Sequence, residues 1–183
     1  MSVPAADRDP SDPPAADPYA AGLVAEACRK SALVWLTPPG SGRAVPAWHV
    51  WHEGAVYVVH EGLEQPLGWL AGSDRVTVTV RSKDKGGRLV SWVARVSALE
   101  PGSDQWNAIV PELHAARLNP PDGEEQPLRW ARESRVTRLE PTGELVEQPG
   151  DMPEGSLAAT PAVTRATTLG RLPFVLGRRR GKR

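Results

Sequence analysis

The sequence of 183 residues has one cysteine, Cys28, one phenylalanine and no net charge, with 22 basic and 22 acidic side chains. A single cysteine excludes an intramolecular disulfide framework and a cysteine-based zinc finger. The zero net charge disfavours a dedicated nucleic-acid-binding protein, because such domains are usually basic. No run of about 18 apolar residues is present, and the first residues lack the basic and apolar regions of a signal peptide. We therefore expect no transmembrane segment and a cytoplasmic protein.

Motifs for common chemistries are also lacking. The four histidines, at positions 49, 52, 60 and 114, do not have the regular spacing of a metal-ligand set, so we predict no metal site. There is no Gly-x-Ser-x-Gly elbow, no Gly-x-Gly-x-x-Gly fingerprint and no Walker loop. Cys28 lies in a predicted helix, where a small core residue is its simplest role. No side chain is nominated as a catalytic acid, base or nucleophile.

Proline and tryptophan, by contrast, are abundant and unevenly placed. The 19 prolines concentrate toward the ends and connections, and the 7 tryptophans all lie between Trp35 and Trp130. Because Pro/Ala/Asp-rich sequence buries little apolar surface, residues 1–18 are predicted to be a disordered arm. Residues 19–140 are predicted to be the folded domain. Residues 141–183, rich in proline and glycine and basic at the end, are predicted to be a disordered tail.

Within the domain, hydrophobic periodicity predicts mostly strands. A short amphipathic helix is expected over 19–30, followed by a strand over 31–36. Two runs, 44–51 and 55–60, are separated by a turn in which Gly54 is available for positive φ, which is typical of a hairpin. Alternating valines predict a half-buried strand over 75–81, and a long strand is expected over 88–99.

The last part of the domain is expected to contain a helix and a final strand. Ser103 is placed to cap a helix that runs to about residue 118 with Trp106, Ile109, Val110 and Leu113 on one face. Residues 127–139 are expected to hold the last strand. The predicted architecture is a mainly β protein, a six-stranded antiparallel barrel or sandwich with two or three flanking helices.

The element order resembles a known family. Residues 31–36, the Gly42-Arg43 turn, the run Ala-Val-Pro-Ala-Trp-His-Val-Trp at 44–51, and Val-Tyr-Val-Val at 56–59 resemble the opening of the flavin-binding split β-barrels. These are the pyridoxamine phosphate oxidase-like superfamily, which includes deazaflavin-dependent oxidoreductases. The resemblance covers about residues 20–140. It implies a split β-barrel homodimer with FMN or F420 in a groove between subunits, and oxidoreductase activity on a substrate that the sequence does not identify.

The resemblance also implies positions for cofactor contact. Arg43 would hold the cofactor phosphate, and Trp48 would lie near the ring, although core or dimer packing is the alternative role for this aromatic cluster. Val59 and His60 would supply backbone groups at the end of the third strand. Lys83 and Arg88, in the basic loop over 81–88, would also bind phosphate, unless that loop is only a solvated turn.

One departure from the family bears on the cofactor. Where the family often has an Arg-Lys pair, this chain has Glu64-Gln65, and no lysine or arginine occurs over 44–74. Because a carboxylate about 4 Å from a phosphate costs on the order of 4 kcal/mol before screening, the usual phosphate clamp is absent or displaced. The alternative to a cofactor-binding protein is therefore a cofactor-free dimeric interaction module.

The basic end of the chain allows other partners. Residues 172–176, Leu-Pro-Phe-Val-Leu, precede five cations and could touch anionic lipid, nucleic acid or an acidic partner. The simpler interpretation is a solubilising terminus. Nucleic-acid binding through the 81–88 loop and this tail is disfavoured by the neutral domain, and it would weaken steeply with salt.

Overall fold

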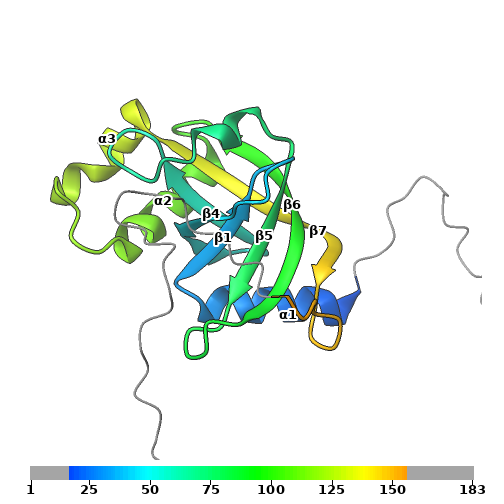
Figure 1. The fold of residues 1–183 in the computed structure, drawn as a ribbon. Coiled ribbons are helices and arrows are strands. Elements are labelled where there is room, and N and C mark those ends of the chain that lie inside the picture. Colours follow the sequence, from blue (N-terminus) through cyan, green and yellow to red (C-terminus); the bar gives the residue numbers. More distant parts are fainter. Residues whose placement is uncertain (1–16, 156–183) are drawn as a thin grey trace, which may run out of the picture.

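The computed structural model describes residues 17–155, which form one antiparallel sheet with three α-helices and two short 3-10 turns (Figure 1). The elements in chain order are α1 (Pro18–Lys30), β1 (Leu33–Thr37), β2 (Val45–Trp48), β3 (Val50–His52), β4 (Ala55–His60), η1 (Gly68–Gly72), β5 (Arg75–Arg81), β6 (Arg88–Leu99), α2 (Asp104–Ala116), η2 (Gly123–Glu125), α3 (Gln126–Glu133) and β7 (Arg135–Glu147).

The sheet is a curled, split antiparallel β-barrel. Its strand order is β2-β1-β5-β6-β7-β4-β3, so the two edge strands, β2 and β3, are consecutive in the chain and separated only by His49. The sheet must therefore curl until its two edges meet at that residue. The predicted mainly β architecture is confirmed. The count is seven strands rather than six because the predicted strand over 44–51 divides at His49.

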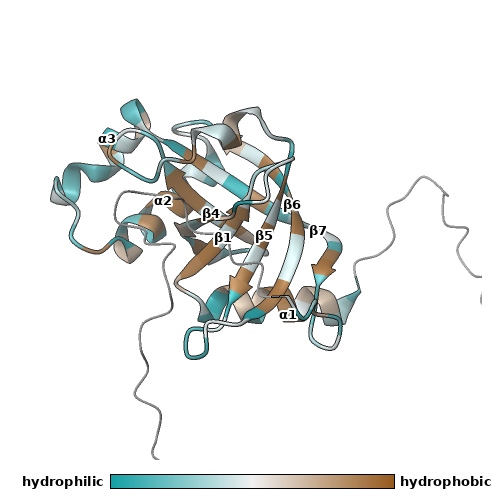
Figure 2. Ribbon diagram, in the orientation of Figure 1, coloured by the Kyte–Doolittle hydropathy of each residue, from teal (hydrophilic) through white to brown (hydrophobic). Residues whose placement is uncertain are grey.

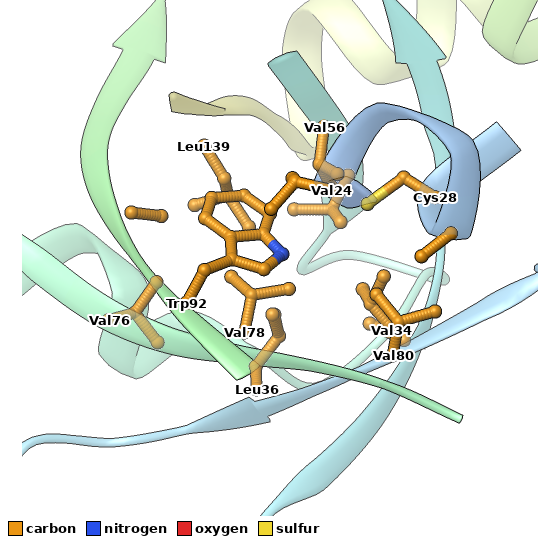
Figure 3. Close-up of a cluster of buried hydrophobic side chains, with 14 of the residues drawn as sticks. Val24, Cys28, Val34, Leu36, Val56, Val76, Val78, Val80, Trp92 and Leu139 are labelled. Atoms are coloured by element: carbon orange, nitrogen blue, oxygen red, sulfur yellow. The ribbon is translucent and has the colours of Figure 1, made fainter. Parts of the chain in front are cut away.

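Helix α1 packs against the interior of the barrel. It begins with Asp17, whose side chain accepts a hydrogen bond from the Tyr19 amide at 2.9 Å, and it crosses one end of the barrel (Figure 1). Its buried side chains Val24 and Cys28 join the inward-facing residues of the strands, among them Trp92 (Figure 3). Burial raises the pKa of the Cys28 thiol to about 12, which makes it an unreactive core residue.

A second core lies on the outside of the barrel, beneath α2 and α3. Strand β4 contributes to both cores, with Val56 and Val58 facing the interior and Ala55, Tyr57 and Val59 facing the helices. This double burial explains why β4 is a continuous apolar run rather than an alternating one. Figure 2 shows the same strand in brown, whereas most of α3 is hydrophilic.

Most predicted elements are confirmed, and one is wrong. The hairpin with Gly54 at φ 79°, the strands over 75–81 and 88–99, and the helix capped by Ser103 are present. Residues 127–133, expected to begin the last strand, belong instead to α3. Pro127 lies in the first turn of this helix, where no backbone N–H is required. The final strand then runs from Arg135 to Glu147, past the predicted domain boundary at 140.

Predictions for the two ends of the chain fall mostly outside residues 17–155, so the disordered arm and the basic tail remain predictions. Within the part of the chain that the structure describes, no helix combines the length and apolar character needed to cross a bilayer. No cluster of three or more histidine, cysteine or acidic residues in that same part is placed to hold a metal ion.

Candidate functional site

The barrel splits at His49, within the run 44–51 along which the resemblance places the cofactor ring, near Trp48. Between β2 and β3 the His49 side chain turns into the protein, and its Nε2 lies 3.1 Å from the Cys28 carbonyl oxygen, to which it donates as an N–H. Burial lowers the pKa of His49 below its usual value. The strand is thus anchored to α1 at its break, while the backbone of Trp48 faces the loop that follows β4.

Gln65 fills the split with a side-chain amide. Its Oε1 accepts from the Trp48 backbone N–H at 2.7 Å, and its Nε2 donates to the carbonyl oxygens of Trp48 at 3.1 Å and Val59 at 3.0 Å. The side-chain amide therefore bonds to Trp48 of β2 and Val59 of β4 as a backbone peptide group of a strand between them would. The backbone donor and acceptor of Trp48 are therefore both bonded within the chain.

Glu64 is the centre of a largely buried ion-pair network. Its carboxylate, 1% exposed, accepts from Arg117 Nε at 3.2 Å, Arg129 Nη2 at 3.0 Å and Trp130 Nε1 at 2.9 Å. Since a buried carboxylate without partners would cost several kcal/mol, these three donors explain why an acid is tolerated here. They tie the loop after β4 to the end of α2 and to α3.

The network is electrically neutral. Asp122 completes it by accepting from Arg129 Nε at 2.6 Å, so two carboxylates meet two guanidinium groups. The hydrogen bond from Arg129 lowers the pKa of Asp122, and the hydrogen bond to Asp122 raises the pKa of Arg129, so both are charged. No cation in this cluster is left in excess for a dianionic phosphate.

The indole of Trp48 packs against this network. Its ring lies 6.5 Å from the Trp130 ring, tilted by 35°, and the Arg117 guanidinium lies 5.6 Å from its centre. These are the distances of aromatic packing and of a cation–π contact. Both contacts come from the chain itself, so they serve the core-packing role that was the alternative to ring contact.

Val59 and His60 are fully buried at the end of β4. The carbonyl of Val59 is bonded to Gln65, and His60 Nε2 lies 2.9 Å from Thr137 Oγ1 on β7. Burial is the main cause that lowers the pKa of His60 below its usual value, which favours the neutral imidazole. The structure brings Trp48, Val59 and His60 together around Gln65.

The three predicted phosphate-binding cations are not brought together within one chain. The β1–β5 register pairs Thr37 with Thr77 and Val34 with Val80. Arg43 follows the Thr37 end, whereas Lys83 follows the opposite end, in the turn beside α1 (Figure 1). The two pairs are three residues apart, so these ends are separated by about 10 Å of strand, because the strand rises about 3.3 Å per residue.

Arg88 has intramolecular partners. Its Nε lies 2.8 Å from Glu147 Oε2, and its Nη2 donates to the carbonyl oxygens of Pro153 and Gly155 at 3.2 Å each. The neighbouring Arg81 donates to the Gly86 carbonyl at 2.7 Å and lies over the Trp35 ring at 5.1 Å. The basic loop is therefore partly used to close its own turn and to fix the chain after β7.

The sequence did not reveal Arg117, Arg129 and Trp130 as part of this site. They lie 53, 65 and 66 residues from Glu64, and no local spacing links them. The sequence feature that pointed to distant partners was the pair Glu64-Gln65, which lies in a segment without lysine or arginine. A buried acid in a segment without cations requires a partner from elsewhere in the chain.

No protein-family model and no curated protein matches the sequence. Solved structures with a similar fold include the heme storage protein HutZ from Vibrio cholerae, at 14% identity and a TM-score of 0.48, covering 64% of this chain and 87% of that one. A FAD-binding protein from Mesorhizobium loti has 14% identity and a TM-score of 0.41, covering 63% and 85%, and an F420 reductase has 15% identity and a TM-score of 0.40, covering 63% and 90%.

The strand order and the split at His49 define the class of this protein: a split antiparallel β-barrel. A further solved structure with a similar fold, a protein related to general stress protein 26 from Clostridium acetobutylicum, is described as a member of the pyridoxinephosphate oxidase family, at 13% identity and a TM-score of 0.42, covering 68% of this chain and 85% of that one. The identities of 13–15% and TM-scores below 0.5 of these neighbours concern the fold, and what their names say they bind is said of them alone.

Proposed function

We propose that this chain is a cofactor-free split-barrel module that functions by protein–protein contact, first with a second copy of itself. The observation that carries the proposal is the state of Glu64. At the position where related barrels often have a basic pair, its carboxylate is bonded to Arg117, Arg129 and Trp130. A flavin phosphate at this place would meet a neutral, already satisfied network.

Exposed leucines around the network support a contact surface. Leu63, Leu118 and Leu128 are 68%, 81% and 64% exposed. Each is the chain neighbour of a network member, namely Glu64, Arg117 or Arg129. Because exposed large apolar side chains favour association, we assign these three leucines (63, 118 and 128), called here the leucine patch, as the self-contact surface.

The absence of a cofactor is tested on the full-length protein. We expect no absorbance above the aromatic band in a fresh preparation, and no quenching of FMN or F420 fluorescence on titration. A yellow preparation, or saturable binding of either compound at micromolar concentration, would contradict the proposal.

Self-association is tested separately by light scattering after size exclusion. We expect the wild type to be a dimer, and the double variant Leu118→Asp, Leu128→Asp to be a folded monomer. Val146→Asp is the matched control, because Val146 is 51% exposed but lies on β7 and outside the patch. A dimer that survives the double variant, or a monomeric wild type, would remove the leucine patch from the proposal.

The second candidate is a flavin- or deazaflavin-dependent oxidoreductase, and one observation favours it. Arg43, in the loop before β2, makes no ion pair with any residue over 17–155, so its charge is available for a phosphate. If this candidate is right, FMN or F420 binds the wild type, and Arg43→Gln weakens that binding about tenfold or more. If Arg43→Gln binds FMN or F420 as tightly as the wild type does, Arg43 does not hold the phosphate.

A further inference from the structure

A cavity of about 400 Å³ lies between α1 and the curled part of β7. The helix side is lined by Ala21, Ala25 and Val24, and the barrel side by Trp51, Trp92 and Leu145. Because alanine reaches only one carbon from the backbone, α1 leaves space here that a larger side chain would fill. Figure 3 shows Val24 beside the indole of Trp92 in the adjoining core.

A bulge in β7 forms the outer wall of the cavity. Trp92 pairs with Leu145 and Ala94 pairs with Pro141, so four steps of β7 lie opposite two steps of β6. The extra residues surround Gly143 at φ 88°, and Thr142 Oγ1 donates to the Val93 carbonyl at 2.9 Å. Bulges that are held in place like this bend a strand away from its partner, which here keeps the cavity open.

The rim of the cavity is acidic. Glu53, Glu140 and Glu144 line it, and Arg29 is its one lining cation among the described residues. Glu140 and Glu144 are paired with Arg138 and Arg75, whereas the Glu53 side chain is 82% exposed and lies 3.7 Å from His52. An occupant that suits this site has an apolar part for the cavity and a positive charge for the rim.

The chain itself contains a segment with that chemistry. Residues 172–176 read Leu-Pro-Phe-Val-Leu, and Arg178, Arg179 and Arg180 follow after one glycine. This is the apolar patch with a basic end that the sequence singled out and that the barrel does not explain.

The segment can reach the cavity. The described chain ends at Gly155, whose carbonyl is held by Arg88, and Arg88 lies four residues before Trp92 on β6, or about 13 Å along the strand. Sixteen residues lie between 155 and 172, and the seventeen steps from one to the other span up to about 56 Å when extended. A tether of this kind gives millimolar effective concentration, which favours the chain's own tail over a free peptide.

We propose that the cavity between α1 and the β7 bulge is the docking site of the chain's own residues 172–176, with the arginines that follow them meeting the carboxylates at the rim. The tail can then be displaced. A partner that binds its arginines competes with Glu53 and the neighbouring carboxylates, and residues 172–176 leave the cavity. This inference is independent of whether the split binds a cofactor.

Phe174 is the only phenylalanine in the chain, which makes the test specific. Full-length protein grown with 4-fluorophenylalanine gives one ¹⁹F resonance, and we expect it to be shifted and broadened relative to its position in concentrated urea. Ala21→Trp fills the cavity and should return the resonance to the urea position. Glu26→Trp is the matched control, because Glu26 is exposed on the same helix and does not line the cavity.

Trypsin gives a second readout in the same full-length variants. Cleavage after Arg171 should be about tenfold faster in Ala21→Trp than in the wild type, because only the undocked tail is cut. A wild-type resonance at the urea position, or equal behaviour of Ala21→Trp and Glu26→Trp, would overturn the proposal. A shift that grows with protein concentration would assign the cavity to the tail of a second copy and contradict docking within one chain.

Discussion

Glu64 holds together three segments that are far apart in sequence, so replacing its charge tests what the network contributes. Glu64→Gln keeps the shape but removes the charge that balances Arg117 and the largely buried Arg129. Loss of one partner from a buried ion pair costs about 3–5 kcal/mol, and the remaining bond from Arg129 to Asp122 keeps the expected loss near the lower value. Urea unfolding of the two proteins measures it.

Glu61 is the control for this prediction because it lies in the same loop and also pairs with an arginine. Its carboxylate is 38% exposed, and its partner Arg135 is 55% exposed. Exposed pairs contribute about 0–1 kcal/mol, so Glu61→Gln should unfold close to the wild type. Equal effects of the two substitutions would mean that the Glu64 network has no special role.

Gln65 makes three hydrogen bonds to the backbone across the split, and each bonded group would lose its partner in Gln65→Ala. We expect the Trp48 amide to exchange its hydrogen at least about tenfold faster, since a bond that closes the barrel edge is lost. Hydrogen exchange followed by NMR at Trp48 measures this. Leu63→Ala, two residues earlier and highly exposed, should leave that rate unchanged.

At the scale of the element, α2 depends on a side-chain cap that the sequence already indicated. Ser103 Oγ accepts from the Trp106 amide at 3.2 Å, and α2 carries Trp106, Ile109 and Leu113 into the outer core. Ser103→Ala should lower the free energy of unfolding by about 1 kcal/mol, whereas Ser103→Asp should retain most of it. Thermal unfolding compares the three proteins, and equal loss in both variants would contradict a capping role.

Elements with a strong local pattern were predictable, and those set by tertiary contacts were not. The alternating valines of β5 and the capped face of α2 give their structures directly. Helix α3 buries Trp130 but exposes Leu128, so its sequence lacks the apolar stripe that predicts a helix. Pro127 also argues against a helix when only the sequence is known, although here it lies in the first turn. The break between β2 and β3 at His49 could not be predicted from the sequence either, because it depends on a hydrogen bond to the Cys28 carbonyl 21 residues away.

At the scale of the whole molecule, the candidate site was predictable only where neighbours in sequence are neighbours in space. Trp48, Val59 and His60 meet, because β3 and β4 form a local hairpin that leads to the split. The cations were grouped by charge alone, and the register then separates Arg43 from Lys83. The partners of Glu64 lie in helices whose packing no local pattern encodes.

Two buried histidines should make the whole fold sensitive to mild acid. Burial lowers the pKa of both His49 and His60 from their ordinary value of 6.5. Below about pH 6.5 the unfolded chain therefore binds more protons at these histidines than the folded chain does. Stability is therefore complete above about pH 6.5 and falls as the pH drops toward the lowered values, at about 1.4 kcal/mol per unit of pKa difference. Asp122 and Glu140, whose pKa values are lowered from 3.8 and 4.5, titrate below this range.

The measurement is urea unfolding at about pH 7.5 and about pH 5.5, which brackets the histidine range while carboxylates stay ionised. The wild type should be less stable at the lower pH. His60→Gln, which retains a side chain able to bond Thr137, should lose less stability between the two conditions, whatever its stability at neutral pH. Because the comparison uses the pH dependence within each protein, general destabilisation by the substitution does not affect it. An equal loss in both proteins would mean that His60 is protonated as easily in the folded barrel as in the unfolded chain.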